Sequence, residues 1–279
     1  MTDLPYPADV MEPPTWRRDA GTRIGTAGWS IPRANADACP GEGTHLQRYA
    51  RVFGAVEINS SFHRSHQVST YRKWADHVPD DFRFAVKLPR AITHDARLRG
   101  VRGPFEAFLD ETAGLGAKRG PLLVQVPPSL EFDRGVVRRF FAMMRRATTG
   151  AIVCEPRHRT WFTDGADEVL REFGVSRVAA DPPPVPGADR PGGAAALVYY
   201  RLHGSPRKYW SSYDDPFVLA LARRLAIDAS ECWCIFDNTA SGAALANALE
   251  LQAIISGVPS ADGSGMGKQI RRSAAGRRG

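Results

Sequence analysis

Eight short runs rich in Val, Ile, Leu, Phe and Tyr recur along the chain, and most of the segments between them show helical periodicity. In residues 45–53, for example, Leu46, Tyr49, Ala50 and Phe53 fall at i, i+3, i+4 and i+7. Strands that alternate with helices are typical of a parallel sheet. We therefore predict strands at residues 23–27, 55–59, 82–87, 121–126, 151–155, 176–180, 196–202 and 232–237.

The pattern favours an α/β fold made of a single (β/α)8 TIM-type barrel, because eight strands lie within 233 residues and such barrels have about 250. The alternative is an open doubly wound sheet, which usually has fewer strands and a glycine-rich phosphate turn after the first one. The segment Gly25-Thr-Ala-Gly28 lacks the spacing of that turn. Residues 181–195 contain the sequences PPPVPG and PGG, which cannot be helical. We therefore predict that a Pro/Gly-rich loop replaces the helix between strands 6 and 7.

The two ends of the chain differ in composition from the middle. Residues 1–22 are rich in proline and acidic residues, and residues 256–279 are rich in glycine, serine and arginine. We expect both ends to be disordered, the second as a basic tail, which leaves residues 23–255 as the barrel domain. Of the formal net charge of +7, this middle part carries +5, which favours an anionic small molecule or nucleic acid as partner.

Cysteine content and hydropathy bear on the compartment. Cys39, Cys154, Cys232 and Cys234 lack the CxxC spacing and the density of a secreted disulfide scaffold. No run of eighteen apolar residues is present, and the first residues lack the basic and apolar regions of a signal peptide. We expect a cytoplasmic protein without a membrane partner, and the sequence does not indicate its oligomeric state.

Polar residues stand near the C-terminal ends of the predicted strands, at positions that would face the barrel interior. On the third strand Lys87 shares a face with Ala85, which leaves Phe84 and Val86 for the helices. Polar groups are costly to bury without partners, so we expect these residues to converge on one site. The convergent set is Glu57, Asn59, Lys87, Gln125, Glu155, Arg157, Asp181, Arg201, His203 and Asp237.

This set has three interpretations. In the first, Glu155 and Asp237 neutralise Arg157 and Arg201 in an ion-pair ring without chemistry. In the second, Glu57 and Glu155 form a carboxylate pair for metal-free acid–base catalysis. In the third, carboxylates and an imidazole hold one divalent ion, Mg²⁺, Mn²⁺ or Zn²⁺, although the nearby arginines would compete for the same carboxylates. The predicted metal ligands are Glu155, Asp181, His203 and Asp237.

The loops after the third, seventh and eighth strands predict an anionic ligand. Residues 87–102 are rich in arginine, and residues 203–213 interleave basic with aromatic side chains. The segment that begins at Asp237 leads into a helix, and barrels often hold phosphate at a helix N-terminus there. The candidate substrate-binding residues are Asn59, Arg90, His94, Gln125, His158, Arg207, Lys208 and Asn238.

Seven motifs occur in a fixed order and resemble those of a known family. They are Gly25-Thr-Ala-Gly-Trp-Ser30, Val56-Glu-Ile-Asn-Ser-Ser-Phe62, Phe82-Arg-Phe-Ala-Val-Lys-Leu-Pro-Arg90, Gly120-Pro-Leu-Leu-Val-Gln-Val-Pro-Pro128, Glu155-Pro-Arg-His158, Tyr200-Arg-Leu-His-Gly204 and Phe236-Asp-Asn-Thr-Ala240. Together they resemble the YecE-like family, domain of unknown function 72. The resemblance implies a TIM-type barrel in a bacterial-type cytoplasmic protein, and it leaves the activity unassigned. His63 stands where the family pattern leads us to expect tyrosine, and the segment Ile31-Pro-Arg33 lacks the expected tyrosine and tryptophan.

From these observations we predict an enzyme that acts on a phosphorylated sugar or nucleotide-like substrate by hydrolysis or isomerisation, with or without a divalent metal. Lys87, Arg157 and Arg201 would stabilise charge, and Glu155 would be a ligand or general base. The alternative is a non-catalytic binder of nucleic acid or phosphorylated metabolites. The candidate catalytic residues are Glu57, Lys87, Glu155, Arg157 and Arg201.

Overall fold

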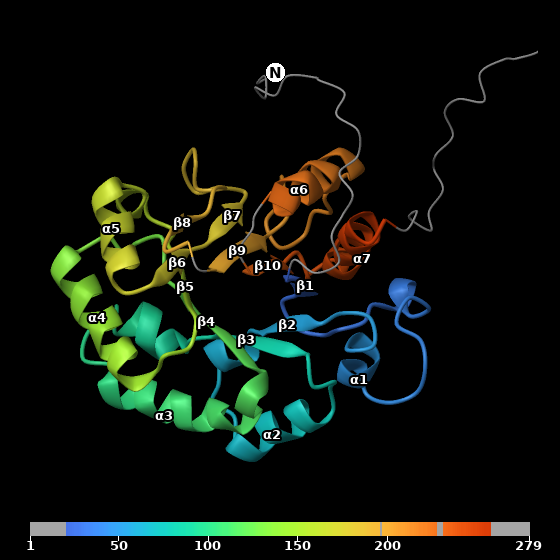
Figure 1. Cartoon of the computed structure of the whole chain (residues 1–279), viewed down its shortest axis with the longest axis horizontal. Helices are drawn as coiled ribbons and strands as arrows, with labels where there is room; N and C mark the ends of the chain where they lie inside the picture. The colour runs from blue at the N-terminus through green and yellow to red at the C-terminus, as the bar shows by residue number, and fades with distance from the viewer. Residues whose placement is uncertain (1–20, 196, 228–230, 258–279) are drawn as a thin grey trace, which may run out of the picture.

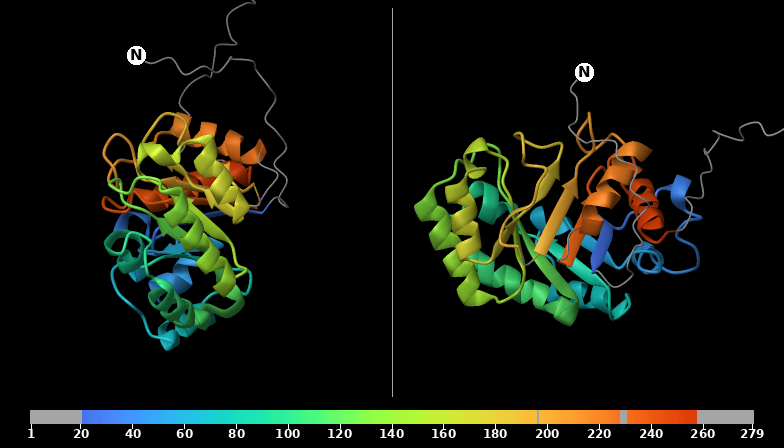
Figure 2. Two further views of the ribbon diagram at one scale, coloured as in Figure 1. Left: turned by 90° about the vertical axis from the view of Figure 1, so that its left-hand side faces the viewer. Right: turned by 45° about the horizontal axis from the view of Figure 1, so that its top comes forward.

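The computed structural model describes residues 21–257 except 196 and 228–230. It confirms the α/β class: β-strands occupy the interior and helices surround them, as Figure 1 and the turned views of Figure 2 show. The predicted disordered ends lie outside the described residues, apart from 21–22 and 256–257. None of the helices in the described part of the chain is both long and apolar enough to cross a bilayer.

The strands form two sheets whose neighbours run parallel, except that β8 runs antiparallel to β6. The first sheet has the order β1-β10-β9-β7, and the second has the order β2-β3-β4-β5-β6-β8. The strands are β1 (Thr22–Thr26), β2 (Ala55–Ile58), β3 (Arg83–Lys87), β4 (Arg119–Gln125), β5 (Ile152–Glu155), β6 (Val175–Arg177), β7 (Ala179–Asp181), β8 (Gly192–Gly193), β9 (Leu197–Leu202) and β10 (Glu231–Phe236).

The helices carry an apolar face that packs on the strands. In α4, Val137, Phe141 and Met144 are buried, and the Asp133 side chain caps the N-terminus by accepting a hydrogen bond from the Val136 amide at 2.9 Å. The α-helices are α1 (His45–Tyr49), α2 (Val68–Asp76), α3 (Arg102–Thr112), α4 (Arg134–Ala147), α5 (Asp164–Glu172), α6 (Asp215–Ile227) and α7 (Ala243–Ile255).

The eight predicted strands are all present, and the sixth is divided in two. Its first half, β6, pairs with β5, and its second half, β7, pairs with β9. Val178 lies between them and donates its amide hydrogen to the Cys154 carbonyl at 2.8 Å. The chain therefore passes from one sheet to the other at this residue. Between β7 and β9 the described residues form β8 and no helix, which agrees with the predicted Pro/Gly-rich loop.

The two sheets also meet between β1 and β2. Ala27 and Glu57 form an isolated parallel bridge, and the Gly28 amide donates to the Glu57 carbonyl at 2.8 Å. At Gly25 the backbones approach so closely that a Cβ atom would lie 2.3 Å from the Ala55 carbonyl oxygen. A side chain at Gly25 would therefore push the first strand away from the second.

We expect Tyr49→Phe to lower the free energy of unfolding by about 2–3 kcal/mol. The Tyr49 hydroxyl accepts a hydrogen bond from the Thr26 amide at 2.9 Å and donates one to the Ala55 carbonyl at 3.0 Å, so it bridges β1 and β2. Its loss would leave both buried backbone groups without this partner. Denaturant unfolding checks the value, and a change below about 0.5 kcal/mol would show that the bridge is unimportant.

Apolar side chains form two cores, one on each side of the strands. The larger core lies between strands and helices and includes Phe84 and Val86, as predicted. The smaller one is contributed by strands of both sheets, and several members precede a polar candidate by two residues, so they share its face. The members with this spacing are Ala55, Ala85, Leu123, Val153, Tyr199 and Ile235.

Candidate functional site

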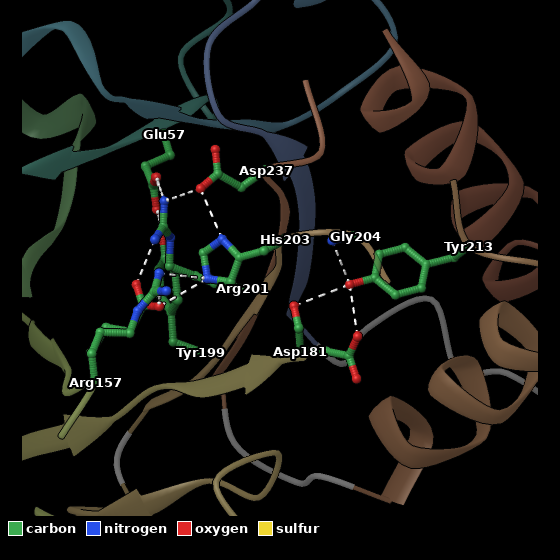
Figure 3. A network of polar contacts seen from close by, with 10 residues as sticks. Glu57, Arg157, Asp181, Tyr199, Arg201, His203, Gly204, Tyr213 and Asp237 are labelled. Carbon is green, nitrogen blue, oxygen red and sulfur yellow. Dashed lines mark hydrogen bonds and ion pairs between the residues drawn. The ribbon is translucent and has the colours of Figure 1, made fainter. Parts of the chain in front are cut away.

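Arg201, on β9, is the centre of a buried polar cluster above the smaller core (Figure 3). It is completely buried, and it donates to three carboxylates. Its Nε and Nη2 atoms lie 3.0 and 2.7 Å from the two oxygens of Glu57, and Nη2 lies 2.9 Å from Asp237 Oδ2. Its Nη1 donates to Glu155 Oε2 at 2.5 Å. One guanidinium thus joins residues from β2, from β5 and from the end of β10.

Arg157 and His203 extend this cluster. The two ring nitrogens of His203 lie 3.0 Å from Asp237 Oδ2 and 2.9 Å from Glu155 Oε1. Arg157 Nη2 lies 2.6 Å from Glu155 Oε1 and 3.0 Å from His203 Nε2. The ion pairs expected between Glu155 or Asp237 and the two arginines are therefore formed.

Two carboxylates of this cluster, Glu155 and Asp237, are held in the ionised form. Burial alone would raise the pKa of Glu155, but Arg157 and Arg201 outweigh burial and hold that pKa well below its usual range. The pKa of Asp237 is lowered in the same way against burial, chiefly by Arg201. Glu57 and Glu155 are completely buried, and both oxygens of each are engaged with basic groups or with the Tyr199 hydroxyl. As a carboxylate pair they lack access to solvent, and none of their oxygens is left without a protein partner.

The four predicted metal ligands are not brought together in one site. Asp181 lies to one side of the cluster in Figure 3, where its Oδ1 accepts a hydrogen bond from the Tyr213 hydroxyl at 2.9 Å. The other three, Glu155, His203 and Asp237, already bond to one another or to the arginines. Within residues 21–257, apart from the gaps, no three His, Cys, Asp or Glu side chains are grouped to hold a metal. A dication here would also face two fixed guanidiniums.

A cavity of 350 Å³ opens beside the cluster at the C-terminal ends of β2, β3, β4 and β10. It combines basic side chains with neutral hydrogen-bonding groups and aromatic rings, and it includes five predicted substrate-binding or catalytic residues. Its lining consists of Asn59, Phe62, His63, Lys87, Arg90, His94, Gln125, Tyr209 and Asp237.

Lys87 is the deepest cation of this cavity. It is 9% exposed, and its Nζ atom lies 4.1 Å from the centre of the Phe62 ring. Burial, and then the charge of Arg201, lower the pKa of Lys87 to about 8, although nearby carboxylates such as Glu57 act in the opposite direction. A substantial part of the amine can therefore lose its proton near neutral pH, which an ordinary lysine does not do.

His94 and Asn59 supply further polar groups. His94 lies in a single π-helical turn, Ala91–Asp95, a distortion that is common at functional sites. Burial and then the charges of Lys87 and Arg90 lower the pKa of His94, which favours the neutral imidazole. The buried Asn59 Oδ1 has no hydrogen-bond partner among the described residues, so a donor on a ligand would satisfy it.

The remaining candidates lie elsewhere. Arg157 and His158 line a separate hollow of 540 Å³ next to the loop that follows β7. Arg207 and Lys208 are exposed, and the Arg207 guanidinium lies 4.6 Å from the Trp210 ring centre. Asn238 is buried and acts as a brace, because its Nδ2 donates to the Ser211 carbonyl and to Asn247 Oδ1 at 2.9 and 3.0 Å.

Three aromatic residues of the site were not among the predicted site residues. Phe62 and Tyr209 line the cavity, and the Tyr199 hydroxyl donates to Glu57 Oε2 at 2.8 Å. Tyr199 could have been found, because it precedes Arg201 by two residues on one strand and so shares its face. Tyr209 has a left-handed backbone conformation, with φ of 65°, and no local sequence signal predicts that conformation.

A family model described as "Protein of unknown function DUF72" matches residues 23–263 of the chain. The chain belongs to this family. The UPF0759 protein YecE of Escherichia coli K12 is 30% identical over 151 residues, which cover 52% of this chain and 55% of that protein. The UPF0759 protein YunF of Bacillus subtilis is 25% identical over 207 residues, which cover 68% of this chain and 73% of that protein. The chain thus aligns with about half the length of YecE.

Solved structures of DUF72 family proteins have a similar fold. TM1631 of Thermotoga maritima gives a TM-score of 0.70 at 24% identity, with 84% of this chain and 99% of that chain covered. EF0366 of Enterococcus faecalis gives a TM-score of 0.69 at 21% identity, with 86% of this chain and 99% of that chain covered. The predicted resemblance to the YecE-like family is confirmed, and the chain shares with these proteins an α/β fold whose strands here are largely parallel and lie in two sheets.

Proposed function

We propose that the protein is an enzyme that binds a small phosphorylated molecule, a sugar phosphate or a nucleotide-like compound, in the cavity at Lys87. The charge of the lining carries this proposal. Lys87 and Arg90 are basic, and Arg90 Nε also pairs with the exposed Asp95 at 3.1 Å. The one acidic lining residue, Asp237, is already paired with Arg201. The cavity therefore offers positive charge without a free carboxylate, and 350 Å³ lies in the range of small-molecule sites.

Proton transfer is the chemistry that these side chains support best. Lys87, with its pKa lowered to about 8, can accept or donate a proton near neutral pH, and the neutral His94 can accept one. Isomerisation next to a carbonyl group needs such a base and acid, and it can proceed with side chains alone. Hydrolysis is supported less well, because Glu57 and Glu155 are locked in ion pairs and cannot activate water.

We expect glycerol 3-phosphate to bind with an affinity that falls about tenfold in Arg90→Ala, because a charge-assisted contact to phosphate is lost. Affinity should also fall several-fold as the pH rises from 7.5 to 9.5. The phosphate stays dianionic above pH 7.5, whereas Lys87 loses its charge through its pKa of about 8. Isothermal titration calorimetry at fixed ionic strength measures both effects.

Arg223→Ala is the matched control, since Arg223 is exposed on α6 and lies outside this cavity. Its affinity for glycerol 3-phosphate should equal that of the wild type. The proposed function fails if the compound does not bind at millimolar concentration. It fails equally if Arg90→Ala and the change of pH leave the affinity unaltered.

A second candidate function is non-catalytic binding of nucleic acid. The exposed loop after β9 favours it, because Arg207 stacks on Trp210 there and Lys208 is adjacent. A polyanion site of this kind would lose affinity steeply with salt, with a slope set by the number of phosphates contacted. A steep slope with single-stranded oligonucleotides, together with no binding of glycerol 3-phosphate, would favour this function over the enzyme.

The proposal takes the two sheets to act as one (β/α)8 barrel with the cavity at its C-terminal mouth. Three observations support this arrangement. The Gly28 amide donates a hydrogen bond to β2. The chain continues from β6 to β7 through Val178. Strands of both sheets build the smaller core. Active sites of such barrels lie at the C-terminal ends of the strands, where this cavity opens.

A further inference from the structure

Lysine is rare in this chain, and its use at the cavity is selective. Lysine and arginine together number 37 in the chain, and only five of these are lysines: Lys73, Lys87, Lys118, Lys208 and Lys268. Arginine binds phosphate at least as well as lysine, because its planar guanidinium donates two hydrogen bonds. Lysine differs in that it can lose its proton and become a nucleophile. A lysine at position 87 therefore offers more than a positive charge.

Lys87 also lacks the partner that a buried ammonium group normally has. Among the described residues its Nζ contacts the Phe62 ring and makes no hydrogen bond and no ion pair. The nearby carboxylates of Glu57 and Asp237 are bonded to Arg201 instead. By contrast, Lys118 Nζ donates to two backbone carbonyls at 2.8 and 2.9 Å. The Lys87 residue is thus only 9% exposed, and its amine at the cavity wall is available to a ligand.

We infer that Lys87 forms an imine with the carbonyl carbon of a phosphorylated aldehyde or ketone bound in this cavity. The inference rests on the proposed function and names its substrate class. Arg90 would hold the phosphate near the rim, because its side chain is 59% exposed, whereas Lys87 lies deeper. A carbonyl compound with a phosphate at one end fits this division of the cavity into an outer cation and an inner amine.

The chemical step needs no oxidant or reductant. The neutral Lys87 amine attacks the carbonyl carbon, a C–N bond forms, and the oxygen takes the proton that the attacking nitrogen loses, which gives a carbinolamine. The C–O bond then breaks, the oxygen leaves as water with a second proton, and a protonated imine remains. His94 lines the same cavity, and its imidazolium form, protonated from solvent, can deliver that second proton. With a pKa of about 8, ~10% of Lys87 is neutral at pH 7, against well under ~0.1% for an ordinary lysine.

Pyridoxal 5′-phosphate is an aldehyde that carries a phosphate, and we use it to test the inference. Borohydride reduces the imines that it forms with lysines, and mass spectrometry then maps the modified lysines. We expect Lys87 to be modified at least tenfold faster than the exposed Lys73 and Lys208. Glycerol 3-phosphate should slow this reaction, and pyridoxal without phosphate should react more slowly. Lys87→Arg should keep glycerol 3-phosphate binding within a few-fold and lose the rapid modification, whereas Lys73→Arg, on the exposed face of α2, should behave as wild type.

The outcomes separate this inference from the proposed function. If glycerol 3-phosphate binds but Lys87 is not modified in the wild type, the imine is ruled out and the proposed function stands. If glycerol 3-phosphate does not bind and Lys87 is not modified, both are ruled out. Selective modification of Lys87 that glycerol 3-phosphate suppresses supports both. The mapping on the wild-type protein decides these cases even where a variant at position 87 does not fold.

Discussion

Arg201→Met is expected to lose about 5 kcal/mol or more of the free energy of unfolding, and so to leave little folded protein. The substitution would strand the carboxylates of Glu57, Glu155 and Asp237 in a buried site, where Arg201 now neutralises them. Uncompensated buried charge is among the largest destabilising effects that one substitution can cause. Circular dichroism and denaturant unfolding of the purified protein measure the loss.

Two further variants show whether charge is the cause. Arg138→Met removes an exposed ion pair with Glu172 and should cost less than about 1 kcal/mol. Adding Glu57→Gln and Glu155→Gln to Arg201→Met removes two stranded charges and should recover part of the stability. An Arg201→Met protein as stable as the wild type, or a triple variant less stable than the single one, would contradict this account.

Acid is expected to destabilise the protein by several kcal/mol between about pH 5 and pH 2. The pKa values of Glu155 and Asp237 are lowered in the folded state, so the unfolded chain takes up protons first as the pH falls. Their contribution is complete above the unfolded carboxyl pKa values of about 4 and is lost toward the lower folded values. Urea unfolding at a series of pH values measures this slope.

Glu155→Gln should reduce the acid slope, because the substituted side chain no longer titrates. Glu106→Gln, which alters an exposed ion pair with Arg102 on α3, should leave the slope unchanged. Equal slopes in the wild type and Glu155→Gln would show that the buried cluster does not govern acid unfolding.

Periodicity predicted the strands and their faces because side chains alternate along a strand. It placed Lys87 with Ala85 inside and Phe84 with the helices, and it placed Arg201 and His203 on one face; the structure has each of these arrangements. The division of the sixth strand was not predictable. It depends on which neighbour each half pairs with, β5 or β9, and that choice is made by residues far apart in the sequence.

The pairing of charges was equally hidden. Sequence placed three carboxylates and two arginines near one another, but only their positions in space show that Arg201 contacts all three carboxylates. Asp181 was predicted with them on the basis of its place at a strand end. The Tyr213 hydroxyl, 32 residues later in a loop, holds it instead, and no local pattern links these two residues.

The pairing of β1 with β10 has a consequence for biosynthesis. Thr22 lies opposite Cys232 and Thr26 opposite Phe236, so the first strand finds this neighbour about 210 residues later in the chain. During translation most of the polypeptide leaves the ribosome before that ladder can form, while β2 to β5 already have their neighbours in order. The first strand therefore keeps an unpaired edge until β10 has been synthesised, and an unpaired edge is exposed to misassembly and to chaperone binding.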